Sequence, residues 1–173
     1  KKAPSLADLV TSSHLHPVNT NNWLTRNGFW KCAKCKACAR GKNTTQYHLS
    51  NGKLRNITER ITCETEFVVY VIECICGKKY IGSTTNKLKL RILQHWRAVK
   101  NKDFNYVTAK HAWECHGGVL NKLSYYGIKQ IMKLDRGGNR EQKLRRAESK
   151  LIMEIGTEIP TGLNTDAELH VHL

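Results

Sequence analysis

The fold of this chain is decided by FVVYVI at residues 67–72, followed by CGK at residues 76–78 and KYIG at residues 79–82. The first run is rich in β-branched and aromatic residues and is apolar on both faces, which is typical of a central strand covered on both sides. Gly77 predicts a tight turn between this strand and a short partner strand at residues 79–82. The chain therefore forms a β-hairpin at this point.

Downstream of the hairpin the sequence predicts mainly helices. Thr84 or Thr85 can cap the first helix, Asn139 can cap the last, and Gly156 ends it. The predicted elements are helices over residues 86–100, 107–115 and 140–154 and a third strand over residues 125–134. Together they indicate an α+β fold, with a small three-stranded mixed or antiparallel sheet flanked by helices.

The chain upstream of the hairpin differs in composition and is only weakly periodic. Residues 1–30 are polar and weakly periodic, and we interpret them as an arm or linker with one helical turn near residues 5–10. Residues 31–65 are rich in cysteine and lysine, and no stretch there is apolar enough to form a core, so a small knuckle stapled by a metal is expected. We therefore divide the chain into residues 1–30, 31–65 and 66–173.

Seven cysteines without a secretory signal favour zinc over a disulfide framework. Thiolates at short spacing are preferred zinc ligands. One set is Cys32, Cys35 and Cys38, whose fourth ligand is Cys63 or His48, and the other is Cys74, Cys76, His111 and His116. The alternative for the two histidines is an ordinary surface position. Cys115 is left over as a free thiol.

The charge of the chain indicates a polyanionic partner. There are 29 basic and 14 acidic residues, which give a formal net charge of +15. No apolar run approaches the ~20 residues that a membrane helix needs. The basic residues expected to follow a DNA backbone are Lys31, Lys34, Lys36, Arg40, Lys42, Lys78 and Lys79. The aromatic residues Trp23, Trp30 and Tyr47 either stack on bases or pack against the zinc knuckle.

The last predicted helix carries an unusual carboxylate. Leu144 and Ile155 lie on one face of this helix, and Glu148 falls on the same stripe. A carboxylate is rarely buried on an apolar stripe without a partner. It is either a rim residue bonded to Arg145 or Arg91, or a metal-binding or catalytic group at the base of a cleft.

In this order, the strand, hairpin, helix and late glutamate resemble the GIY-YIG nuclease family over roughly residues 66–164. The first motif of the family corresponds to Val69-Tyr70-Val71, of which only the tyrosine is kept, and the second is complete as Tyr80-Ile81-Gly82. The further residues that match the family are Arg91, His95, Glu148 and Asn164.

The resemblance implies a metal-dependent phosphodiesterase. Glu148 would hold Mg²⁺ or Mn²⁺, and Arg91 would bind the scissile phosphate. Tyr70 would orient or deprotonate the attacking water, Tyr80 would contact the water or the phosphate, and Asn164 would orient the last loop. The pKa of free tyrosine, ~10, is high for a base, so Tyr70 needs assistance. The groups that would assist it are a nearby cation, Lys78, Lys79 or His95.

A finer resemblance is to the C-terminal endonuclease region of Penelope-like retroelement proteins. The sequence APSLADL at residues 3–9 precedes the cysteine triplet, ITC at residues 61–63 leads into the first strand, and the Cys-Cys-His-His set matches an insertion that marks that group. The resemblance implies a nuclear enzyme that nicks DNA and exposes a 3′-hydroxyl for target-primed reverse transcription. Its partners would be DNA, the reverse transcriptase portion of the same polyprotein and the element RNA.

Two other functions stay open from the sequence. One is a zinc-stapled DNA-binding module without activity, and the other is a host repair or restriction nuclease of the same fold. Intact Tyr70, Arg91 and Glu148 favour an enzyme over the first. The cysteine triplet and the segment at residues 4–6 argue against the second.

Overall fold

A three-stranded antiparallel sheet lies at the centre of the protein. The structure, a computed structural model, describes residues 26–133 and 138–165. The strands β5 (Val68–Cys74), β6 (Lys79–Thr84) and β7 (Leu123–Gln130) lie in the order β6-β5-β7. The middle strand β5 is buried almost throughout, because both of its faces are covered. The predicted central strand and its hairpin partner are therefore confirmed.

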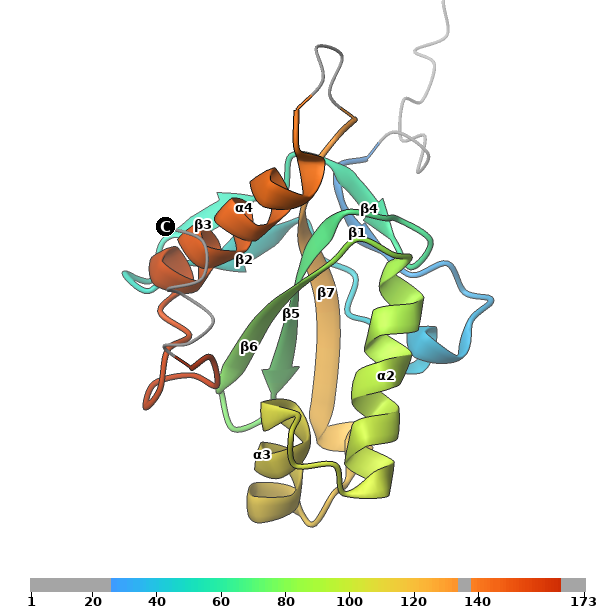
Figure 1. The fold of residues 1–173 in the computed structure, drawn as a ribbon, viewed down its shortest axis with the longest axis vertical. Helices are drawn as coiled ribbons and strands as arrows, with labels where there is room; N and C mark the ends of the chain where they lie inside the picture. Colours follow the sequence, from blue (N-terminus) through green and yellow to red (C-terminus); the bar gives the residue numbers. More distant parts are fainter. Residues whose placement is uncertain (1–25, 134–137, 166–173) are drawn as a thin grey trace, which may run out of the picture.

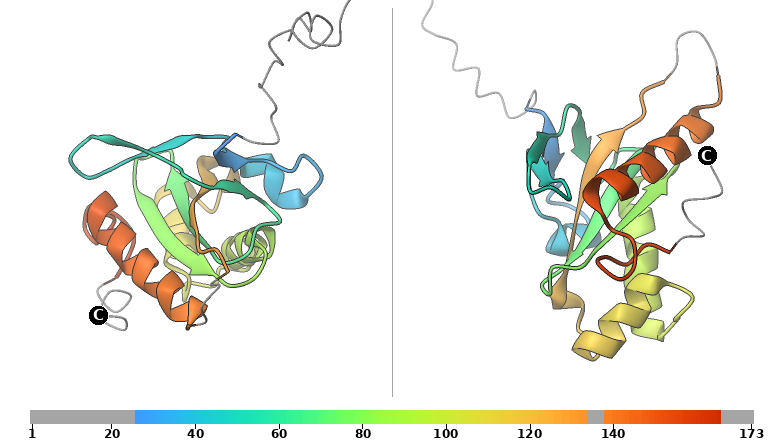
Figure 2. Two further views of the ribbon diagram at one scale, coloured as in Figure 1. Left: turned by 90° about the horizontal axis from the view of Figure 1, so that it is seen from above. Right: turned by 90° about the vertical axis from the view of Figure 1, so that its left-hand side faces the viewer.

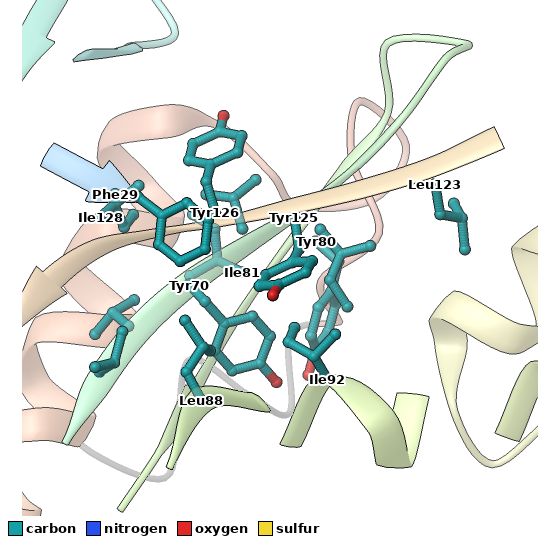
Figure 3. Packing of buried hydrophobic residues seen from close by; sticks show 14 of the residues in the cluster. Phe29, Tyr70, Tyr80, Ile81, Leu88, Ile92, Leu123, Tyr125, Tyr126 and Ile128 are labelled. Carbon is teal, nitrogen blue, oxygen red and sulfur yellow. The ribbon is translucent and has the colours of Figure 1, made fainter. Parts of the chain in front are cut away.

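Helices cover both faces of this sheet (Figures 1 and 2). One face carries α2 (Leu88–Asn101) and α3 (Val107–His116), and the other carries α4 (Arg140–Ile155). Figure 3 shows the tyrosines of the sheet divided in the same way, with Tyr126 pointing away from the side on which Tyr70 and Tyr80 lie. The predicted α+β fold is confirmed, and the sheet is antiparallel rather than mixed. Among the described residues, none forms a helix long and apolar enough to cross a membrane.

The start of α2 differs from the prediction. The helix begins at Leu88, and its N-cap residue makes no side-chain capping bond, so neither threonine of the pair at residues 84–85 caps it. Instead the backbone N–H groups of Leu88 and Lys89 donate to the carbonyls of Thr65 and Cys63, each at 2.9 Å. These carbonyls satisfy donors that a capping side chain would otherwise take. The cysteine-rich segment thus anchors the first turn of α2.

The other boundaries lie closer to the prediction. The side chain of Asn139 accepts a hydrogen bond from the N–H of Gln142, which confirms the predicted cap of α4. Gly117 and Gly156 end α3 and α4 in the left-handed conformation that favours glycine. The third strand starts and ends earlier than predicted, because the short 3₁₀ helix η2 (Leu120–Lys122) leads directly into it.

The cysteine-rich segment joins the core of the sheet. The end of the predicted arm forms β1 (Gly28–Trp30), and the cysteine-rich segment contains the 3₁₀ helix η1 (Lys36–Arg40), β2 (Gln46–His48), β3 (Leu54–Asn56) and β4 (Arg60–Thr62), which pairs with β1. The ring of Phe29 packs edge-on against Tyr125 of β7 at 5.4 Å, and both side chains are fully buried. Ile61 lies over Gly127, where a Cβ atom would approach it to 2.6 Å. The apolar residues of this segment therefore pack against the sheet and share its core.

The predicted arm at residues 1–30 is described only from residue 26 onward. Its predicted helical turn near residues 5–10 and Trp23 lie outside the described residues.

Candidate active site

Tyr70 occupies the centre of the sheet, at the position where the two motifs meet. Its side chain is fully buried, and its strand neighbours in register are Gly82 of β6 and Gly127 of β7. A Cβ atom at Gly82 would lie 2.6 Å from the Tyr70 hydroxyl oxygen. The tyrosine ring therefore requires a glycine beside it, and this explains the glycine of Tyr80-Ile81-Gly82 physically.

The Tyr70 hydroxyl joins two side chains from α2. It lies 2.8 Å from Nε2 of His95 and accepts a hydrogen bond from Nε of Arg91 at 3.2 Å. Burial, reinforced by the positive charge of Arg91, lowers the pKa of His95 to about 3. The imidazole is therefore neutral at physiological pH. Its other nitrogen, Nδ1, lies 2.9 Å from the Thr108 hydroxyl of α3.

An open pocket of about 480 Å³ lies beside β6, between α2 and α4. Tyr80 of β6, Arg91 of α2 and Glu148 of α4 all line it. The Ser83 hydroxyl donates a 2.6 Å hydrogen bond to the Glu148 carboxylate. Arg91 thus reaches both the pocket and the buried Tyr70. An arginine, a tyrosine and a glutamate line one open pocket, which is a combination that suits phosphodiester hydrolysis.

Asn164 holds the C-terminal segment against the outer edge of β6. Its side chain is fully buried and bonds to both backbone groups of Ile81: the Ile81 N–H donates to Oδ1 at 2.9 Å, and Nδ2 donates to the Ile81 carbonyl at 2.7 Å. The Thr157 hydroxyl also donates to Oδ1, at 2.8 Å. The amide therefore mimics a neighbouring strand and positions β6, the strand that carries Tyr80.

The model of the GIY-YIG catalytic domain matches residues 66–131 of this chain. Residues 66–131 form a GIY-YIG catalytic domain. Domains of this family are nucleases, act on DNA and use divalent metals. The match contains Tyr70, Tyr80, Arg91 and His95, whereas α4 with Glu148 lies beyond it. Searches of the curated proteins and of the solved structures found no significant match.

Four cysteines meet where the cysteine-rich segment contacts α2 of the GIY-YIG domain. The sulfur of Cys38 lies 3.4 Å from those of Cys32, Cys35 and Cys63. Thiolates about 2.3 Å from a tetrahedral zinc ion lie about 3.8 Å apart, so this donor set fits zinc. His48, the other candidate for the fourth ligand, is exposed on β2 and is not part of the cluster.

A second cluster joins the β5–β6 hairpin to α3. The sulfur of Cys74 lies 3.0 Å from Nε2 of His116, and the sulfur of Cys76 lies 3.3 Å from Nε2 of His111. All four ligand atoms lie within 4.8 Å of one another, which also fits zinc. Cys115, the leftover thiol, lies 3.5 Å from Nδ1 of His111.

The two lysines expected to assist Tyr70 lie elsewhere. The ammonium group of Lys79 is 3.8 Å from the Glu73 carboxylate, which Lys42 also contacts at 2.9 Å. Lys78 lines a separate pocket between α3 and the C-terminal segment. Among the three side chains named for this role, His95 alone contacts the Tyr70 hydroxyl in the described part of the chain.

Some residues expected at a DNA interface contact other parts of the protein instead. The guanidinium of Arg40 donates to the Leu120 carbonyl at 3.1 Å and lies over the Trp96 ring. Tyr47 is buried against α4 rather than free to stack on bases. Trp30 donates to the carbonyl of Arg26, whose guanidinium covers its ring. Lys31, Lys34 and Lys36 are exposed, as a contact with DNA requires.

Sequence reasoning missed Ser83 and Thr108. Ser83 follows Tyr80-Ile81-Gly82 directly, and strand alternation places it on the face opposite Gly82, where α4 packs. That alternation was a usable signal for a contact with Glu148. Thr108 gave no comparable signal, because its contact with His95 depends on how α3 packs against α2.

Proposed function

We propose that this GIY-YIG domain nicks one strand of DNA and leaves a 3′-hydroxyl that primes reverse transcription. The observation that carries the proposal is the convergence of Tyr80, Arg91 and Glu148 on one open pocket beside β6. The pocket opens at the edge of the sheet, where an extended DNA strand can reach it. An open position of this kind suits a long polymer better than a small, enclosed substrate.

The side chains divide the chemistry as follows. Arg91 binds the scissile phosphate with a planar set of donors, which suits a phosphate that gains charge in the transition state. Glu148 would hold Mg²⁺ or Mn²⁺ through its carboxylate oxygens, and the ion would supply the positive charge that favours the transition-state phosphate and the leaving oxygen. Ser83 fixes the orientation of that carboxylate through its 2.6 Å hydrogen bond.

The two tyrosines take different roles. Tyr70 was expected at the attacking water, but its side chain is fully buried, whereas Tyr80 lines the pocket. A hydroxyl without solvent access cannot take a proton from a water in the pocket. We therefore assign the water to Tyr80 and give Tyr70 a positioning role, in which its oxygen holds Arg91 at 3.2 Å.

The retroelement context is the finer part of the proposal. The Cys-Cys-His-His and four-cysteine clusters support it, because both donor sets assemble as the Penelope-like pattern implies. In this proposal each cluster holds one structural Zn²⁺, the reverse transcriptase portion of the same polyprotein extends the new 3′-hydroxyl along the element RNA, and the enzyme works in the nucleus. Exposed lysines of the cysteine-rich segment contact the DNA backbone.

A plasmid assay tests this function. Supercoiled DNA with Mg²⁺ or Mn²⁺ should give the nicked circle, and a reverse transcriptase should extend the nick without prior end repair. Glu148→Gln should lower the rate by ~10²-fold or more while DNA binding is kept, because glutamine keeps the size of the side chain but loses the charge. Glu154→Gln is the matched control: it lies on the same helix, ion-paired with Arg55 away from the pocket.

Each alternative gives a different result in this assay. A DNA-binding module without activity would bind the plasmid but leave it supercoiled with either metal. A repair or restriction nuclease would leave linear DNA or ends that a polymerase cannot extend. Either result contradicts the proposal, as does equal loss of activity in Glu148→Gln and Glu154→Gln.

A further inference from the structure

A buried line of polar groups runs from α3 to the active-site pocket. The Thr108 hydroxyl lies 2.9 Å from Nδ1 of His95, Nε2 of His95 lies 2.8 Å from the Tyr70 hydroxyl, and that hydroxyl accepts from Arg91 at 3.2 Å. Thr108, His95 and Tyr70 each have an exposed fraction of 1 % or less. Of these four side chains, Arg91, at the end of the line, is the one that lines the open pocket beside β6. The line therefore connects the interior to the side chain that meets the phosphate.

The donor and acceptor strengths of these groups decide which atom donates in each hydrogen bond. Arg91 can only donate, so the Tyr70 oxygen accepts from it. A phenol is a stronger donor than an aliphatic hydroxyl, and an unprotonated ring nitrogen is a strong acceptor, so the Tyr70 O–H points to Nε2 of His95. A neutral imidazole carries one proton, which then resides on Nδ1 and is donated to Thr108. Donation in one direction strengthens each successive bond.

We propose that Thr108 is a positioning residue, which accepts the Nδ1 proton of His95 and so holds the hydrogen-bond chain through Tyr70 that aims Arg91 at the phosphate. This inference rests on the proposed nuclease function of the pocket. No proton transfer along the chain is needed, because each group only keeps its orientation. Without an acceptor at Thr108, the other tautomer of His95 would present Nε2–H to the Tyr70 oxygen and compete with Arg91.

The position of Thr108 is itself well defined. It lies in the first turn of α3, whose buried residues Ala109 and Ala112 fix the helix in the core. One turn further along, His111 belongs to the Cys-Cys-His-His cluster that ties α3 to the β5–β6 hairpin. The acceptor for His95 is therefore held by the fold before any DNA binds.

Two substitutions isolate the hydroxyl. Thr108→Val keeps the shape of the side chain but removes the acceptor, and Thr108→Ser keeps the acceptor but removes a methyl group. We expect Thr108→Val to lower kcat about tenfold or more, with KM for plasmid DNA unchanged. Thr108→Ser should stay within about threefold of the wild type. A purely structural role would instead lower the melting temperature of both variants without separating them in kcat.

The tautomer of His95 gives a second measurement, which needs no cleavage. Nitrogen-15 spectra of histidine-labelled protein, with zinc content verified and signals assigned by a His95→Gln variant, should show the Nδ1–H form in the wild type and in Thr108→Ser. Thr108→Val should lose that form. A wild-type Nε2–H form, or full activity of Thr108→Val, would overturn the inference. A protein that holds the tautomer but cuts no DNA would instead contradict the proposed function.

Discussion

At the residue scale, the site depends on Tyr70, whose ring leaves room only for glycine at position 82 of the neighbouring strand. Gly82→Ala would place a methyl group 2.6 Å from the Tyr70 oxygen and 2.9 Å from the Tyr80 ring. Both neighbours are buried side chains of the same sheet, so neither can move freely. We expect the variant to lose about 1–3 kcal/mol of stability and at least tenfold in cleavage rate, because both tyrosines shift. Urea unfolding and the plasmid assay measure the two effects.

Gly41→Ala is the matched control for this substitution. There the added methyl group would come closest to the exposed, flexible side chain of Lys31, at 2.9 Å, and would lie at an ordinary contact distance of 3.5 Å from the Phe29 ring. Its stability and activity should stay close to those of the wild type. If the two substitutions lowered stability and cleavage rate equally, the close packing of Gly82 against Tyr70 would not be the cause.

A second residue-scale prediction separates the two tyrosines. Tyr80→Phe removes the hydroxyl that lines the pocket and should lower the cleavage rate by ~10²-fold or more, whereas Tyr70→Phe removes only the support of Arg91 and should cost less. Single-turnover rates with bound DNA measure the difference. A larger loss of cleavage rate in Tyr70→Phe than in Tyr80→Phe would mean that Tyr70, and not Tyr80, acts on the attacking water.

Sequence reasoning could single out residues whose chemistry conflicts with their surroundings. Glu148 was singled out because a carboxylate interrupts an apolar stripe, and it does line the pocket. Arg40 gave the opposite outcome, since an arginine among lysines suggests a solvent-facing charge. Its guanidinium instead satisfies the carbonyl of Leu120, some 80 positions away, and no local pattern encodes such a partner.

At the scale of elements, β6 is positioned from its open edge by Asn164. Asn164→Ala would leave the Ile81 N–H and carbonyl without their present partner in a buried site. Unsatisfied buried groups cost about 1–3 kcal/mol, so we expect at least about 2 kcal/mol of lost stability and a lower cleavage rate. Asn101→Ala, at an exposed position near the end of α2, should change stability by less than about 0.5 kcal/mol. Thermal unfolding of both variants tests this; equal stability would exclude the edge-holding role.

The helix boundaries differ in whether neighbouring residues or a distant segment satisfy the first turn of the helix. Asn139 caps α4 with its own side chain, and a pattern within four residues is enough to predict it. The first turn of α2 is satisfied by the carbonyls of Cys63 and Thr65, from a segment more than 20 residues upstream. A local capping rule therefore placed the start of α2 at a threonine that makes no such bond.

At the scale of the whole molecule, the two clusters link segments that the sheet alone does not join. Cys63 connects the cysteine triplet to the start of α2, and the second cluster connects the hairpin to α3. We expect two Zn²⁺ per chain by elemental analysis. Cys32→Ser should lose one zinc and lower the melting temperature, because metal-binding energy is folding energy here.

Cys115→Ser is the control for that measurement, since Cys115 lies outside both ligand sets. It should keep both metals. One zinc or none in the folded wild type would remove one of the two proposed sites.

The net charge of +15 predicts binding through the DNA backbone, and the structure shows which of the lysines expected at the interface are exposed. Lys34 and Lys36 are exposed, whereas the guanidinium of Arg40 already bonds to the Leu120 carbonyl and to the Asn121 side chain. Each phosphate contact adds about 0.9 to the slope of log K against log salt concentration. The double variant Lys34→Ala/Lys36→Ala should therefore lower that slope by about 2, measured by fluorescence anisotropy between about 50 and 200 mM salt.

Arg40→Ala is the control: it should lower the melting temperature and leave the slope unchanged. The reverse pattern would place the DNA on another face, because only charges that release counterions on binding contribute to the slope.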